Sequence, residues 1–348
     1  MQTPRTSSLL LSLLLGCSAV NTSGGGAGDP DADPTAPTDA VAAMDAVAPR
    51  DVVTVVDRPT VTDRPSKSTD TGPALPDDPA ARSAEAMCGR FRASSAAARS
   101  SVGWTPGAMS CDPGTLPDAT RSAALEALNL FRWLAGLGPV AESAQRHDAA
   151  QACAVLLDRN GMLSHTPPMT WNCWSSLGYD GTSHSNLIGG RGINLTAWYA
   201  VSRLIDDRND VTRTLGHRRW MLYPPLGDVG YGQTSAFACL YVLGGARGAR
   251  ARPWVAWPNP GPTPVETIPP SWSFSTQSLG WRDGVSAVTV TRDGAPVAVN
   301  ATRRAPNYGD DTVSWDIPNV TAGSVYAVEI SGISLGTVRY EVRPVNCM

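Results

Sequence analysis

The sequence predicts an α+β fold, preceded by a disordered tail and followed by a small all-β sandwich. Apolar residues recur at helical spacing in three segments between residues 118 and 207, and two apolar runs at 228–243 are typical of paired strands. Short alternating runs follow between residues 285 and 342. All 23 aromatic residues lie from Phe91 onward, so the first quarter of the chain has no aromatic side chain with which to build a core.

The N-terminus has the pattern of an export signal. Arg5 is followed by a leucine-rich run that is too short to span a bilayer as a mature helix. The sequence Leu14-Leu-Gly-Cys17 resembles a bacterial lipobox, in which cleavage before the cysteine leaves that residue N-terminal and lipid-modified. Residues 1–17 are therefore predicted to be a lipoprotein signal with Cys17 as the lipid anchor, and Ser18 favours the outer membrane or cell surface. A soluble secretory signal is the alternative.

Residues 18–85 are predicted to be a disordered linker rich in Asp, Pro, Ala and Thr. Eleven Asp and Glu85 against four Arg and one Lys give this stretch a charge of −7, whereas the whole chain carries −3. Aspartates recur every six residues from Asp33 to Asp63, but the prolines and the lack of large apolar residues favour a spacer over a β-helix. The chain as a whole has no basic excess, so no nucleic-acid partner is expected.

Six cysteines remain once Cys17 is assigned to the lipid anchor. An even number in an exported protein indicates three disulfides, which fifteen connectivities could satisfy. No CxxC occurs, so the pattern does not support a zinc ribbon or a thioredoxin-type site. The expected pairing is Cys88–Cys111 as a local link, Cys153–Cys173 across the next helix and loop, and Cys239–Cys347 tying the C-terminus back.

The central region is predicted to be a domain at residues 118–250, after a cysteine-containing lead-in at 86–117. A first helix begins near Asp118, carries Leu125, Leu128 and Leu134 on one face, and ends before Gly136. Further helices are expected at residues 143–160 and 196–207, and strands at 228–233 and 236–243.

A set of short motifs in this domain resembles the CAP superfamily, which comprises cysteine-rich secretory, antigen 5 and pathogenesis-related proteins and is also called the SCP-like domain. The resemblance covers roughly residues 118–245 and implies an α-β-α sandwich. The motifs, in order, are Asn129-Leu-Phe-Arg132, Gly136-Leu-Gly-Pro-Val140, Ala149-Ala-Gln-Ala-Cys-Ala154, Leu163-Ser-His165, Ser185-Asn-Leu-Ile188, Leu215-Gly-His-Arg-Arg219 and Val229-Gly-Tyr-Gly232.

The resemblance also implies a cleft lined by two histidines and two glutamates, where several CAP proteins hold a divalent metal. His165 and His217 match the two histidines. The glutamate-asparagine pair of the family falls on Ser185-Asn186, so the first glutamate is a serine here. Two imidazoles can bind zinc, with less charge compensation than in the family pattern. The second glutamate has no clear match. The nearest acidic candidates are Asp206 and Asp207, and His184 is a candidate third nitrogen ligand. Arg218 and Arg219 are expected to pair with Asp206, Asp207 or Asp210.

The C-terminal region, residues 251–348, is predicted to be a β-sandwich that resembles an immunoglobulin domain. A proline-rich connector at 253–262 leads into a hairpin whose turn is Asp293-Gly294, because both turn residues must accept a positive φ. Further strands are expected at 313–317, 326–330 and 338–342. An accessory or binding role is expected for this domain.

Taken together, the patterns favour an extracellular, membrane-anchored binding module whose His-lined cleft takes a small-molecule, lipid or protein ligand. Zinc is the candidate cofactor of this cleft. Two alternatives remain open: a metal-dependent hydrolase acting on peptide or cell-wall material, and a structural or adhesion protein with a vestigial cleft. The sequence contains no HExxH, GxSxG, P-loop or GxGxxG motif, so no enzyme class is indicated.

Overall fold

The computed structural model describes residues 78–100, 103–190, 192–208, 213–244, 250 and 252–348. The predicted signal peptide, the anchor Cys17 and the predicted linker up to residue 77 lie outside these described residues. Helices and strands are both present, as the predicted α+β class requires. In the described part of the chain, no helix has the length and apolarity needed to cross a membrane.

A three-stranded antiparallel sheet lies at the centre of the first part of the chain. Its strand order is β1-β3-β2, with Ser185 opposite Tyr241 and Gly189 opposite Phe237. Side chains alternate between the two faces of a strand, and both faces of β3 are buried. The bounds are β1 Ser185–Gly189, β2 Gly230–Gln233 and β3 Phe237–Tyr241.

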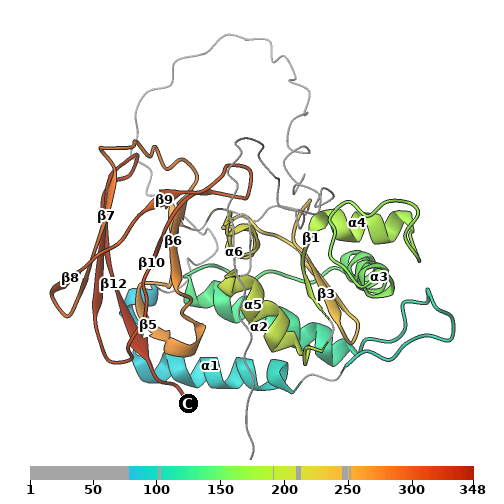
Figure 1. Ribbon diagram of the computed structural model, residues 1–348. Helices are drawn as coiled ribbons and strands as arrows, with labels where there is room; N and C mark the ends of the chain where they lie inside the picture. Colours follow the sequence, from blue (N-terminus) through green and yellow to red (C-terminus); the bar gives the residue numbers. More distant parts are fainter. Residues whose placement is uncertain (1–77, 101–102, 191, 209–212, 245–249, 251) are drawn as a thin grey trace, which may run out of the picture. The chain divides into compact units, whose positions relative to one another are not determined.

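Helices cover both faces of this sheet (Figure 1). Phe237 and Cys239 of β3 pack with the small-residue face of α3, whereas Ala238 and Leu240 belong to the larger core formed with α1, α2 and α5. The first part of the chain therefore has three layers, helix, sheet and helix. The helices are α1 Ala84–Arg99, α2 Asp118–Leu134, α3 Ala144–Asn160, α4 Ser176–His184, α5 Ala197–Asp206 and α6 Gly216–Met221.

The helices α2, α3 and α5 confirm the three that the apolar periodicity predicts, whereas α1, α4 and α6 were not expected. Ser83 caps α1 by accepting a hydrogen bond from the Ala86 N–H at 3.1 Å. The predicted linker is thus too long at its C-terminal end, since α1 begins at Ala84 and a short 3-10 helix precedes it at Pro79–Ala81. The close packing of α4 on α3 needs Gly181, because a Cβ there would lie 2.1 Å from the Ala149 carbonyl oxygen.

The C-terminal region, residues 252–348, which we call the C-terminal domain, consists of two sheets that share one core, and Val255, Trp257 and Cys347 of this region also pack in the core of the preceding helices. Trp272 and Trp315 from one sheet pack in the same cluster as Val290 and Tyr326 from the other. One sheet has the order β4-β6-β10-β9, and the other has the order β5-β12-β11-β7-β8. The strands are β4 Trp254–Trp257, β5 Gly261–Pro264, β6 Ser271–Thr276, β7 Ala287–Arg292, β8 Ala295–Val297, β9 Thr302–Arg303, β10 Asp311–Asp316, β11 Tyr326–Ile333 and β12 Gly336–Val345, with a 3-10 helix at Val265–Thr267.

Two sequence expectations for this domain have opposite outcomes. The hairpin is confirmed: Arg292 pairs with Ala295, and Asp293 and Gly294 have φ values of 51° and 84°. The prediction of a proline-rich connector is wrong, because residues 253–262 form β4 and the start of β5, one strand in each sheet. Proline fits β5 because this strand lies at the edge of its sheet and pairs with β12 alone.

The six cysteines among the described residues form three disulfides, as their even number predicts, but the predicted pairing is wrong. The Cα atoms are 5.1, 5.1 and 6.3 Å apart in Cys88–Cys347, Cys111–Cys173 and Cys153–Cys239. The expected pairing failed because the packing of the helices and strands, which the sequence does not reveal, selects the cysteines that meet. The inner face of α3 lies on β3, for example, so Cys153 meets Cys239.

Candidate functional site

A small cavity of about 40 Å³ brings together the two histidines expected from the sequence. We call it the two-histidine cavity. Its walls come from the loop before α4, from α4, β1 and α6, from the segment after β3, and from the C-terminal domain. The residues that line it are His165, Ser183, Ser185, Asn186, Thr214, Gly216, His217, Trp220, Leu243 and Tyr308.

His217 is oriented by a buried carboxylate. The Nδ1 atom of His217 lies 2.8 Å from Oδ1 of Asp207, whose side chain is fully buried. The second oxygen, Oδ2, accepts the main-chain N–H of Arg218 at 3.1 Å. Asp207 ends α5 with a left-handed φ of 55°, and this reversal lets its carboxylate meet the start of α6. Since a carboxylate accepts, Nδ1 of His217 holds a proton and Nε2 carries the lone pair of the neutral ring.

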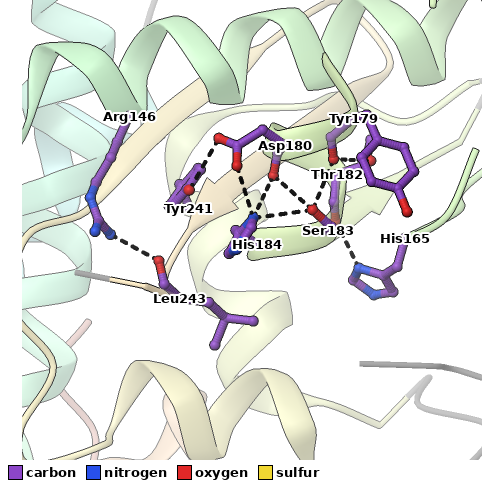
Figure 2. A network of polar contacts seen from close by, with 9 residues as sticks. All are labelled: Arg146, His165, Tyr179, Asp180, Thr182, Ser183, His184, Tyr241 and Leu243. Carbon is purple, nitrogen blue, oxygen red and sulfur yellow. Dashed lines mark hydrogen bonds and ion pairs between the residues drawn. The ribbon is translucent and has the colours of Figure 1, made fainter. Parts of the chain in front are cut away.

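His165 is also held through its Nδ1 atom, in this case by a main-chain carbonyl oxygen. Its Nδ1 atom lies 2.9 Å from the Thr182 carbonyl oxygen, in the last turn of α4 (Figure 2). A carbonyl oxygen only accepts hydrogen bonds, so Nδ1 is again the protonated nitrogen. Both imidazoles that line the cavity therefore have their Nδ1–H donated to an oxygen atom of the protein.

Ser185 and Asn186, the first two residues of strand β1, line the same cavity. The Nδ2 group of Asn186 donates to the main-chain carbonyl of His217 at 3.0 Å, which ties β1 to α6. Ser185 is 3 % exposed, and its Oγ atom has no hydrogen-bond partner among the described residues. A buried hydroxyl is normally hydrogen-bonded, so Ser185 is an unsatisfied polar group in the wall of the cavity.

The structure does not bring His184 into the cavity. The chain changes from helix to strand between His184 and Ser185, so the two neighbouring side chains diverge. The Nδ1 atom of His184 lies 2.9 Å from the Asp180 carbonyl oxygen, and its ring stacks on Tyr241 with centroids 5.3 Å apart (Figure 2). Burial and the nearby Asp180 carboxylate raise the pKa of Tyr241 to about 12.

Neither Asp206 nor Asp207 lines the cavity itself, and Asp206 makes no contact with a cavity histidine. Its Oδ2 atom accepts hydrogen bonds from Arg203 at 2.8 Å and from Arg208 at 2.6 Å. Of the two acidic candidates suggested by the sequence, Asp207 contacts a cavity histidine and Asp206 does not.

Arg218 anchors α6 from behind the cavity. Its main-chain N–H donates to the expected Asp207, but its guanidinium donates to carbonyl and hydroxyl oxygens and not to a carboxylate. Its guanidinium donates to the carbonyl oxygens of Ile205 at 2.7 Å and Asp206 at 2.7 Å. It also donates to the C-terminal domain, at Ser271 O (2.8 Å) and Ser273 Oγ (3.2 Å). Burial lowers the pKa of Arg218 to about 10, so the side chain is still charged at neutral pH.

Arg219 makes a second connection of this kind. It donates to the carbonyl oxygens of Thr214 at 3.1 Å, Ala305 at 2.8 Å and Asp310 at 2.8 Å. Burial lowers its pKa to about 10 as well. Both guanidinium groups are buried between α6 and the C-terminal domain, and they donate mainly to main-chain carbonyl oxygens in place of the predicted aspartates. The third predicted partner, Asp210, lies outside the described residues.

The cavity contains fewer metal-binding side chains than the family pattern implies. Among the residues that the structure describes, no group of three or more His, Cys, Asp or Glu could hold a metal ion. The nitrogen donors of the cavity are His165 and His217, whereas catalytic zinc sites use three protein ligands. The donor type and the tautomers fit a metal ion, but a bound molecule would have to complete its coordination.

Sequence reasoning did not identify Tyr308 and Thr214, which both line the cavity. Tyr308 lies in the C-terminal domain, 91 residues after His217, and no local pattern links the two. Neither a scan against protein-family models nor a search of curated proteins finds a match for this chain.

Proposed function

We propose that this protein is an exported, lipid-anchored binding protein of the CAP type, and that its two-histidine cavity binds a divalent metal ion together with a small ligand. Export is supported by the three disulfides, which persist in oxidising compartments. The CAP assignment is supported by the ordered motifs around His165 and His217 and by the helix-sheet-helix layering.

The observation that carries the metal proposal is the matching orientation of the two imidazoles. Metal-ligating histidines almost always donate their other ring N–H to a carboxylate, a main-chain carbonyl or water, which fixes the tautomer. His217 donates to Asp207 and His165 to the Thr182 carbonyl, so both rings already have the partners that a ligating histidine needs. Imidazole nitrogen suits Zn²⁺, Cu²⁺ and Ni²⁺.

The ligand is expected to complete the site. Two protein nitrogens leave coordination positions for electron-pair donors of a bound molecule, and the ion supplies the positive charge that attracts them. The unsatisfied Oγ of Ser185 provides a further hydrogen bond at the same place. Ser185 occupies the position where the resemblance expects a glutamate, and a hydroxyl is a weaker general base than a carboxylate. For this reason we propose binding rather than hydrolysis.

A zinc titration tests this proposal. Isothermal titration calorimetry with Zn²⁺ is expected to give one binding site in the wild-type protein and none in a His165→Ala/His217→Ala variant, because both nitrogen donors are removed. His184→Ala is the matched control and should bind like the wild type, since His184 does not line the cavity. Wild-type protein that binds zinc no more tightly than the double variant would contradict the proposal.

The carboxylate behind His217 gives a second prediction. Asp207→Asn keeps the shape of the side chain but removes its charge and one of its two acceptors, so zinc affinity should fall by roughly 10–100-fold. Asp206→Asn is the control, because Asp206 pairs with Arg203 and Arg208 outside the cavity. The same titration measures both variants, and equal weakening by the two would show that Asp207 has no special role.

A further inference from the structure

Tyr308 is the part of the C-terminal domain that reaches the two-histidine cavity. It lies on the loop between β9 and β10 and lines the cavity with His217 and Trp220. The loop turns sharply around it, since Asn307 and Gly309 on either side have φ values of 75° and 73°. A wall of the cavity thus comes from a domain outside the CAP-like region.

The loop is fastened to α6, the helix that carries His217. Arg219 donates to Ala305 O on one side of Tyr308 and to Asp310 O on the other, both at 2.8 Å. The carboxylate of Asp310 is held in turn by two hydrogen bonds from Arg250, at 2.8 and 2.7 Å. Both ends of the loop are therefore anchored, which fixes Tyr308 relative to His217.

The chain makes room for the tyrosine ring directly before His217. A Cβ on Gly216 would lie 2.7 Å from Cδ1 of Tyr308, closer than real side chains approach. Glycine at this position permits the ring to pack against the first turn of α6. The guanidinium of Arg219 also lies 5.6 Å from the centre of the Tyr308 ring.

We propose that Tyr308 is a specificity-determining residue of the cavity, which makes the C-terminal domain part of the binding site. The side chain of His217 is 29 % exposed, and the Tyr308 ring forms the wall that limits the groups entering the cavity beside it to small ones. A cavity of about 40 Å³ has room for about three waters, at roughly 10–15 Å³ for each. The ligand is then expected to insert a small donor group, such as a carboxylate or carboxamide, and to keep any bulkier part outside. The role of this group as a metal ligand rests on the proposed function, whereas the blocking role of Tyr308 does not.

The test uses diethyl pyrocarbonate, a reagent that modifies imidazoles, with mass spectrometry to follow each of the four histidines of the purified protein. Tyr308→Ala is expected to speed modification of His217 several-fold, because it removes the wall. Tyr308→Phe retains the ring and should retain the protection. His184, outside the cavity, is the internal reference, and Glu329→Gln, at an exposed ion pair with Arg339, is the control variant in the same domain.

Modification of His217 at the wild-type rate in Tyr308→Ala would overturn the inference. So would wild-type modification of His217 as fast as in guanidinium-unfolded protein, because the cavity would then give no protection. If Tyr308→Ala exposes His217 but the wild type binds no zinc, the role of Tyr308 stands and the metal proposal fails. The two failures are therefore distinguishable.

Discussion

Replacing Cys88 and Cys347 together by alanine is expected to lower the free energy of unfolding by roughly 2–5 kcal/mol. This disulfide joins Cys88 of α1 to Cys347, which follows β12, across a sequence separation of 259 residues. A cross-link over so long a loop removes much of the entropy of the unfolded chain. Both cysteines are also buried, at 6 % and 3 % exposure, so their replacement disturbs the packing around α1.

Guanidinium denaturation under identical conditions measures the effect, with Cys111→Ala/Cys173→Ala as the matched control. That disulfide spans 62 residues and links exposed segments, so its loss should be smaller by about 1 kcal/mol from loop length alone. Equal or greater destabilisation in the control would contradict the assignment of Cys88–Cys347 as the more important cross-link. Mass mapping of disulfide-linked peptides tests the pairing directly.

Arg218→Met is expected to destabilise the protein by about 3–5 kcal/mol, because it leaves several buried acceptors without a donor. The guanidinium of Arg218 donates hydrogen bonds to the carbonyl oxygens of Ile205 and Asp206 on one side and of Ser271 in the C-terminal domain on the other. Methionine keeps most of the side-chain volume, so the loss reports on hydrogen bonds and charge more than on packing. Chemical denaturation measures the change.

Arg208→Met is the matched control for this prediction. Arg208 is half-exposed and forms an ion pair with Asp206 at 2.6 Å. An exposed pair of this kind contributes about 0–1 kcal/mol. An Arg218 variant no less stable than the Arg208 variant would show that the buried arginine does not hold the two domains together.

Much of the local structure could be predicted because its determinants are local. The apolar periodicity of α2, α3 and α5 arises within a few turns of each helix, and the hairpin turn at Asp293-Gly294 depends on two residues that accept a positive φ. The close packing of α4 on α3, which Gly181 makes possible, depends on contacts between the two helices. The short α4 and α6 gave no comparable signal, because helices of nine and six residues are too short to show a clear period.

The candidate site was predictable only in part, and the misses have one cause. His165 and His217 were found by the motifs around them, but no local pattern distinguishes Asp206 from Asp207. The difference arises where α5 ends: the left-handed backbone of Asp207 directs its carboxylate to His217, whereas Asp206 remains on the helix with Arg203. In the same way, the change from α4 to β1 separates His184 from Ser185.

The sequence by itself determined the α+β class, the presence of three disulfides, most of the longer helices and the two histidines of the cavity. The tertiary structure alone decided which cysteines pair, which aspartate orients His217, and that Tyr308 of the C-terminal domain lines the same cavity. The physical reason is that periodicity, caps and turns act between neighbours in the chain. Disulfides and cavity walls form between segments far apart in the sequence, so only the packing of those segments selects their residues.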